Sequence, residues 1–90
     1  MAQYQNQTSM QINLQKIDTV IECINSLPIN FEEKAELVKL TKEFEQSLEK
    51  KDSGKLQTIL QKVADISPKV VGFLLEHASE LGKIGLIFGT

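Results

Sequence analysis

Apolar side chains recur three and four positions apart along most of this chain, which is the spacing of one face of an α-helix. The first such series lies between residues 10 and 27 and comprises Met10, Leu14, Ile17, Ile21 and Ile24. Pro28 ends the predicted helix, because the residue before a proline is disfavoured in the α conformation. Many residues in this stretch are β-branched, which lowers helix propensity. We therefore expect the first helix to depend on packing against the rest of the chain or against a partner.

A second, longer helix is predicted over residues 30–51. Asn30 and Glu33 have the spacing of a capping box, in which side chains bond the free backbone N–H groups of the first turn. The apolar stripe consists of Leu37, Leu40, Phe44 and Leu48, and it is extended at its start by Phe31, Ala35 and Val38. Twelve of the 22 charged residues lie between Glu32 and Asp52, so the remaining face of this helix is expected to contact solvent.

Two further helices follow after short connections. Residues 54–66 have helical spacing and come after a turn in which Asp52 or Ser53 acts as the cap. Ser67 and Pro68 are a start signal for a helix over residues 68–82 or beyond, because proline is favoured in the first turn. Residues 82–90 are expected either to continue this helix or to fray, since they include three glycines. Short connections favour antiparallel neighbours, so the sequence predicts an all-α fold, a small bundle of about four amphipathic helices.

The N-terminal residues differ from the rest of the chain. Residues 1–15 are rich in Gln and Asn, and the first Asp, Glu, Lys or Arg is Lys16. Such a segment holds too little apolar surface to fold alone, so we expect residues 1–9 to form a flexible tail before a single helical domain over residues 10–90. An alternative is that this amide-rich segment pairs as a strand with another chain.

Composition narrows the classes of partner. All ten basic residues of the 90 are lysines, and the calculated pI is near 5.3. Arginine is the usual residue for bidentate contacts to phosphate and to guanine, so a nucleic acid is disfavoured as a partner. A single cysteine allows no internal disulfide, and the first residues lack the basic and apolar regions of a signal peptide. We expect a cytoplasmic protein.

The candidates for catalytic or metal chemistry are few. His77 is the only histidine, and a zinc site needs three or four ligands, so we interpret it as a histidine on the flank of a helix. Cys23 lies on the first helix without a cationic neighbour that would activate it, so we interpret it as a structural cysteine. The sequence contains no glycine-rich phosphate loop and no paired cysteines. We therefore expect no catalytic residues, no metal site and no cofactor, and a protein that is not an enzyme.

The C-terminal segment is apolar and punctuated by glycine. Gly85 and Gly89 form a GxxxG pattern, and Ala78 and Gly82 precede it at the same spacing. Residues 70–89 have the length of a membrane span but include Glu76, His77, Glu80 and Lys83, which argues against a simple transmembrane helix. Three interpretations stay open: a core helix with a closely packed end, a segment that docks onto another subunit, and a helix that lies on a membrane surface.

The order of these elements resembles a known class of module. A long charged helix, the turn KKDSG and the segment LQTILQKVADISPKVVGFLLEHASELGKIGLIFG are similar to small helical modules at the ends of bacterial proteins of defence and conflict systems. The likeness covers about residues 31–89 and rests on helix order and pattern. It implies an assembly or adaptor role in a bacterial cytoplasm and carries over no catalytic residues.

We expect more apolar side chains than one small core can cover, and uncovered apolar patches on small domains usually bind partners. We expect a non-catalytic interaction or assembly module that binds itself as a homo-oligomer, most simply a dimer, or binds a larger protein. The expected interaction residues are Ile17, Ile21, Ile24, Leu81, Ile84, Leu86, Ile87 and Phe88. The alternatives are a membrane-docking protein acting through residues 70–89 and a small antitoxin-like or anti-defence regulator that occludes a partner with the acidic face of the second helix.

Overall fold

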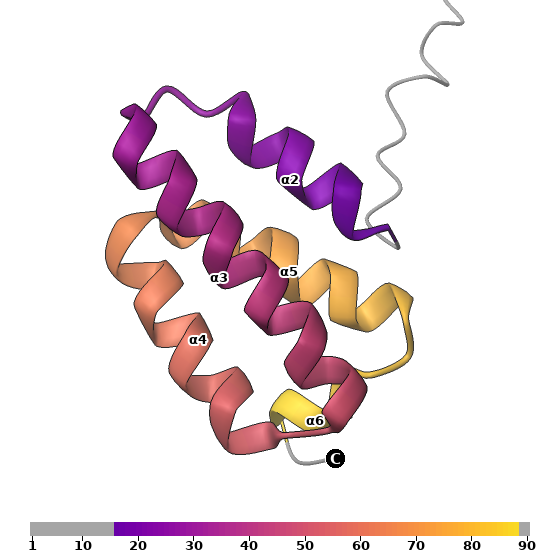
Figure 1. Ribbon diagram of the computed structural model, residues 1–90. Helices are drawn as coiled ribbons and strands as arrows, with labels where there is room; N and C mark the ends of the chain where they lie inside the picture. Colours follow the sequence, from indigo (N-terminus) through magenta and orange to yellow (C-terminus); the bar gives the residue numbers. More distant parts are fainter. Residues whose placement is uncertain (1–15, 89–90) are drawn as a thin grey trace, which may run out of the picture.

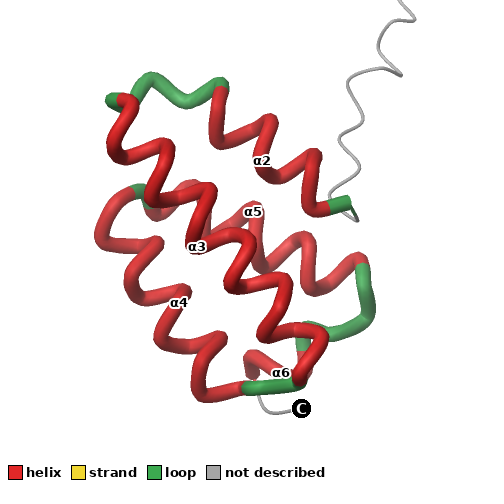
Figure 2. Tube along the Cα trace, viewed as in Figure 1, coloured by secondary structure: helices red, strands yellow, loops and turns green. Residues whose placement is uncertain are grey.

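Five helices make up the part of the chain that the computed structural model describes, residues 16–88 (Figure 1). They are α2 (Ile17–Asn25), α3 (Phe31–Lys50), α4 (Ser53–Ile66), α5 (Pro68–Glu80) and α6 (Gly85–Phe88). Within these residues there is no strand, as Figure 2 shows, and the predicted all-α fold is confirmed. The predicted tail, the start of the first predicted helix and Gly89 lie outside the described residues.

The helix boundaries follow from local signals. The Asn30 side chain accepts a 2.7 Å hydrogen bond from the Glu33 N–H, so the predicted cap of α3 is confirmed. Asp52 caps α4 in the same way, accepting a 3.1 Å bond from the Lys55 N–H. Between these helices Lys51 adopts the left-handed conformation with φ 58°, which ends α3. These side chains bond backbone N–H groups that have no partner inside the helix.

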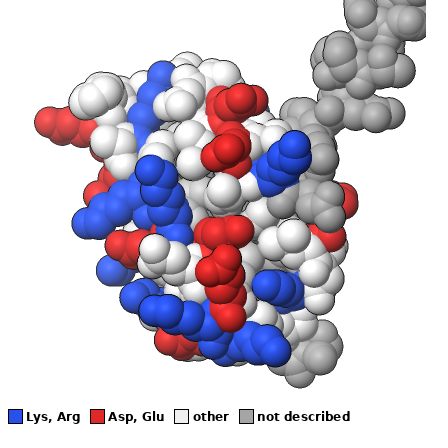
Figure 3. Space-filling view, turned by 45° about the vertical axis from the view of Figure 1, so that its right-hand side comes forward, with Lys and Arg blue, Asp and Glu red and all other residues white. Residues whose placement is uncertain are grey.

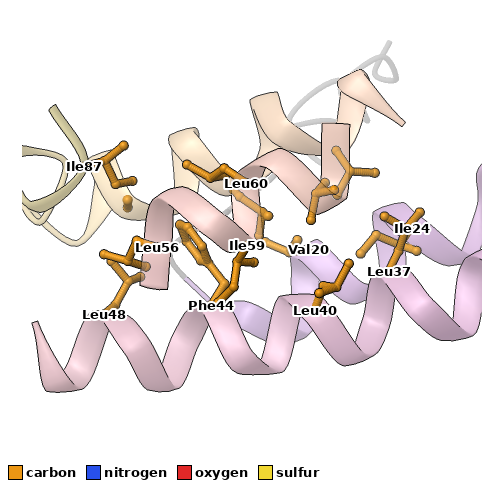
Figure 4. Close-up of a cluster of buried hydrophobic side chains, with 14 residues drawn as sticks. Val20, Ile24, Leu37, Leu40, Phe44, Leu48, Leu56, Ile59, Leu60 and Ile87 are labelled. Atoms are coloured by element: carbon orange, nitrogen blue, oxygen red, sulfur yellow. The ribbon is translucent and has the colours of Figure 1, made fainter. Parts of the chain in front are cut away.

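The hydrophobic core lies around α3, which contacts α2, α4 and α5. Phe44 is fully buried and lies near Leu56 and Ile59 of α4 (Figure 4). At the α2 end of the core, Ile24 lies beside Leu37. The buried apolar residues are Val20, Ile24, Leu37, Leu40, Phe44, Leu48, Leu56, Ile59, Leu60, Val63, Val70, Leu74, Ala78 and Ile87. The core thus draws on all five helices.

The end of α5 differs from both expectations for this segment. The helix stops at Glu80, and Gly82 has a φ of 74°, a conformation that L side chains rarely adopt. The chain turns there and forms α6, which contacts α4. Ile87 is 6% exposed, and the Gln57 side-chain amide donates a hydrogen bond to its carbonyl oxygen. The last residues that the structure describes therefore neither extend α5 nor fray; they fold back and contribute to the core.

The expected extension of the α3 core stripe is wrong at its start. Phe31 is 82% exposed and Ala35 is exposed, although both were expected in the core. At 100° per residue, Phe31 and Ala35 lie about 120° and 160° around the helix from Leu37. By the same measure, the four core residues Leu37, Leu40, Phe44 and Leu48 lie within about 80° of one another around the helix axis. Phe31 and Ala35 therefore lie on a second apolar stripe with Val38, at i, i+4 and i+7. Val38 is half-buried and also packs against the core, as expected, so it borders both faces.

Candidate functional site

His77 lies in the interior of the protein and not on the flank of its helix, where the sequence placed it. It is fully buried, and its Nε2 lies 2.6 Å from Glu45 Oε1 on α3. The description of a histidine on the flank of a helix is therefore wrong. An ionised carboxylate can only accept a hydrogen bond, so the Nε2–H group of His77 is the donor of this bond. This bond joins α5 to the middle of α3.

Burial makes the His77–Glu45 pair a structural contact and unsuited to acid–base chemistry. The His77 side chain is 1% exposed and that of Glu45 is 31% exposed. A general acid or base must come within hydrogen-bond reach of a substrate, and this imidazole has almost no accessible surface. Thr41 lies one turn before Glu45 and is also buried, and its Oγ1 has no hydrogen-bond partner. We interpret these polar groups as parts of the α3–α5 contact.

The sequence held a signal for the burial of His77. It lies on the same stripe of α5 as Val70, Leu74 and Ala78, at helical spacing. No local signal indicated its partner, because Glu45 is 32 positions away on a helix rich in carboxylates.

The cysteine and the carboxylates give no sign of a reactive centre. Cys23 is half-buried against the core, and burial, together with the negative charge of Glu22, raises the pKa of its thiol. A raised pKa lowers the thiolate fraction and hence the reactivity. Among residues 16–88, no group of three or more His, Cys, Asp or Glu side chains is placed to hold a metal ion. In the same range, no helix has the length and apolarity needed to cross a membrane.

The structure separates the eight expected interaction residues into three groups. Ile24 and Ile87 are buried in the core of the chain itself, so they offer no surface to a partner. Five residues are half-buried: Ile17, Ile21, Leu81, Ile84 and Leu86. All of them except Ile21 pack against the core. Phe88 is 63% exposed. Six of the eight therefore still present some surface, and an interaction role for them stays a prediction.

A first apolar surface, which we call the α2–α3 groove, was missed from the sequence. It is a hollow of about 390 Å³ lined by Ile21, Asn25, Phe31, Lys34, Ala35 and Val38. Ile21 was expected at an interface, but the second stripe of α3 was assigned to the core. The angular offset of Phe31 from Leu37 was the signal that could have identified this groove.

A second surface, the α5–α6 hollow, lies at the opposite end of α3. It has a volume of about 500 Å³ and is lined by Lys51, Leu81, Gly82, Lys83, Gly85 and Leu86. A Cβ atom added at Gly82 would meet no other atom within 4 Å, so the space beside this backbone is open. The hollow combines an apolar lining with two lysines.

The two surfaces differ in charge. The first turn of α3, beside the groove, carries Glu32 and Glu33. Lysines gather at the lower end of the molecule in Figure 3, where α3 ends and α6 lies. Lys50, Lys51 and Lys55 belong to this end. The start of α3 therefore carries an exposed aromatic ring and two carboxylates against the single Lys34 of the groove lining. At the other end, Lys50, Lys51, Lys55 and Lys83 outnumber Glu49 and Asp52.

Comparisons with known protein families, with curated proteins and with solved structures find no match to this chain.

Proposed function

We propose that this chain is a non-catalytic protein–protein interaction module that associates with itself through apolar surfaces. The observation that carries the proposal is Phe31, which is 82% exposed and lines a groove together with Ile21, Ala35 and Val38. Burying a phenylalanine side chain contributes about 1.5–3 kcal/mol relative to leaving it in water. A few residues usually dominate the energy of an interface, and many of these are aromatic side chains that fill a pocket of the partner.

Membrane docking through residues 70–89 has less support. Val70, Leu74 and Ala78 are buried in the core of the chain, and the turn at Gly82 prevents one continuous helix over this range. Occlusion of a partner by the acidic face of α3 also has less support, because Glu45 is already bonded to His77. Self-association needs no rearrangement of the core, since the groove is open in the folded chain.

Sedimentation over a concentration series tests the proposal. The wild-type chain should show a sedimentation coefficient that rises with concentration from about 10 to 500 μM, and Phe31→Ser should raise the dissociation constant about tenfold or more. Serine and phenylalanine have similar helix propensities, so the change removes the ring with little effect on α3. Gln46→Ser is the matched control, because Gln46 is exposed on α3 and lies outside the groove. A wild-type chain that stays monomeric over this range would refute the proposal.

A further inference from the structure

The two surfaces described above lie at opposite ends of one helix. Phe31 is the first residue of α3 and Lys51 directly follows its last residue. Twenty residues of α-helix span about 30 Å. Figure 1 shows the start of α3 beside the α2–α3 turn and its end beside α6. The Phe31 ring of a chain therefore cannot reach the α5–α6 hollow of the same chain.

The chemistry of the two ends is complementary. At one end, an exposed aromatic ring is followed directly by the carboxylates of Glu32 and Glu33. At the other end, Leu81 and Leu86 give the hollow an apolar lining, and Lys51 and Lys83 place positive charge on it. An apolar group adjoined by negative charge is what such a hollow would bind, because opposite charges steer association and suppress wrong partners.

The shape of the hollow also suits an aromatic side chain. Its volume of about 500 Å³ exceeds what one phenyl ring occupies and lies in the range of ordinary ligand pockets. Gly82 and Gly85 add no side chain to its lining, so a ring can approach the backbone there. Gly82 has a positive φ of 74°, so another residue would be strained at this position.

We propose that this chain assembles head to tail: the first turn of α3 of one copy enters the α5–α6 hollow of a second copy. Phe31 then packs against Leu81 and Leu86, and Glu32 faces Lys83 or Lys51. This inference rests on the proposed self-association and specifies its interface. The contact is heterologous, so each copy keeps one free end and the assembly continues as a ring or a filament.

A two-fold contact between two α2–α3 grooves is less favourable. A two-fold axis brings the same patch of both copies together, so the first turns of two α3 helices, each with two carboxylates and the single Lys34, would lie close to each other with an excess of negative charge. Like charges across an interface cost free energy and slow the encounter. The head-to-tail contact places those carboxylates against lysines.

Mixing of two defective chains tests the head-to-tail contact directly. The head variant is Phe31→Ser, and the tail variant is Lys51→Glu with Lys83→Glu. Each alone should be at least about tenfold weaker in self-association than wild type, because each lacks one half of every contact. An equimolar mixture should form a 1:1 complex and nothing larger, because the intact hollow of the head variant binds the intact α3 start of the tail variant. Sedimentation velocity and native mass spectrometry measure both results.

Two controls keep the experiment decisive. Circular dichroism checks that each variant is folded, and Lys83→Glu alone serves as the tail variant if the double substitution unfolds the chain. Lys62→Glu, on an exposed position of α4 away from both surfaces, should leave self-association unchanged. If wild type associates but the mixture stays monomeric, the head-to-tail contact is refuted while the proposed self-association stands. If wild type itself is monomeric up to 500 μM, both are refuted.

Discussion

Removal of the hydrogen bond between His77 and Glu45 should destabilise this fold measurably. The substitution Glu45→Ala removes the carboxylate that accepts the hydrogen bond from His77 Nε2–H at 2.6 Å. The His77 side chain is 1% exposed. A buried donor left without a partner costs about 1–3 kcal/mol. Glu45 is itself 31% exposed, so water can enter the space that the shortened side chain leaves. We therefore expect the free energy of unfolding to fall by about 1–2 kcal/mol, which is the lower part of the range for a buried donor without a partner.

Such a loss is large for a domain of this size. A change of 1 kcal/mol shifts the Tm of a domain of 60–100 residues by about 4–8 °C, so Glu45→Ala should lower the Tm by roughly 5–15 °C. Urea unfolding followed by circular dichroism gives the free energy directly. Glu36→Ala is the matched control, because Glu36 is exposed on the same helix and gains the same helix propensity on substitution. Glu36→Ala should change stability by no more than about 0.5 kcal/mol.

Two further variants separate the hydrogen bond from the packing of the side chains. Glu45→Gln keeps a carbonyl oxygen that accepts the Nε2 proton, so it should retain most of the stability. His77→Leu removes the donor together with the other interactions of His77, so a double-mutant cycle with Glu45→Ala is used, and its coupling free energy measures this bond alone. If Glu45→Ala equals Glu36→Ala, the bond contributes nothing and the reasoning is refuted.

Three more predictions concern single positions. Gly82→Ala should lower the free energy of unfolding by about 1–2 kcal/mol, because its φ is 74°. Gly72→Ala should raise it by about 0.5–1 kcal/mol, since Gly72 lies inside α5 and an added Cβ meets nothing within 4 Å; equal effects at the two glycines would contradict this. Thr41→Val should stabilise the fold by about 1 kcal/mol in urea titrations, because it removes a buried hydroxyl that has no partner; a destabilised variant would show that the hydroxyl is bonded. Cys23 should react with a disulfide reagent more slowly in the folded chain than in guanidinium at neutral pH, and its pH–rate profile should lie at higher pH, because burial and Glu22 raise the pKa of the thiol; a profile at lower pH would contradict this.

The sequence predicted the helices well because their limits depend on neighbouring residues. Asn30 caps α3 and Asp52 caps α4 through contacts three positions away, and Pro68 opens α5 as expected. The apolar stripe from Leu37 to Leu48 needs only the period of the helix to be recognised. Such signals lie within one or two turns, so a single sequence contains them.

The features that the sequence did not predict depend on contacts between distant residues. The partner of His77 lies on another helix, and many carboxylates of α3 could have taken that place. The three glycines after α5 indicated only that the helix would be weak there, not that the chain would turn. The burial of Ile87 depends on the contact of α6 with α4. Phe31 was different, because its angular position on α3 already separated it from the core stripe. The spacing of apolar residues, taken without their angular positions around α3, places Phe31 on the wrong face of the helix.

The apparent excess of apolar residues is therefore smaller than the sequence indicated, and it lies elsewhere. Ile24 and Ile87 are needed by the core, whereas Phe31 and Phe88 remain exposed. What decides the geometry of association is that the two apolar surfaces are unlike each other. An isologous contact requires a surface that complements itself, whereas the start of α3 has an excess of carboxylates and its end an excess of lysines. In the proposed head-to-tail contact each end binds the other, so the contact repeats from copy to copy, and a chain that lacks one end should stop the growth of the assembly.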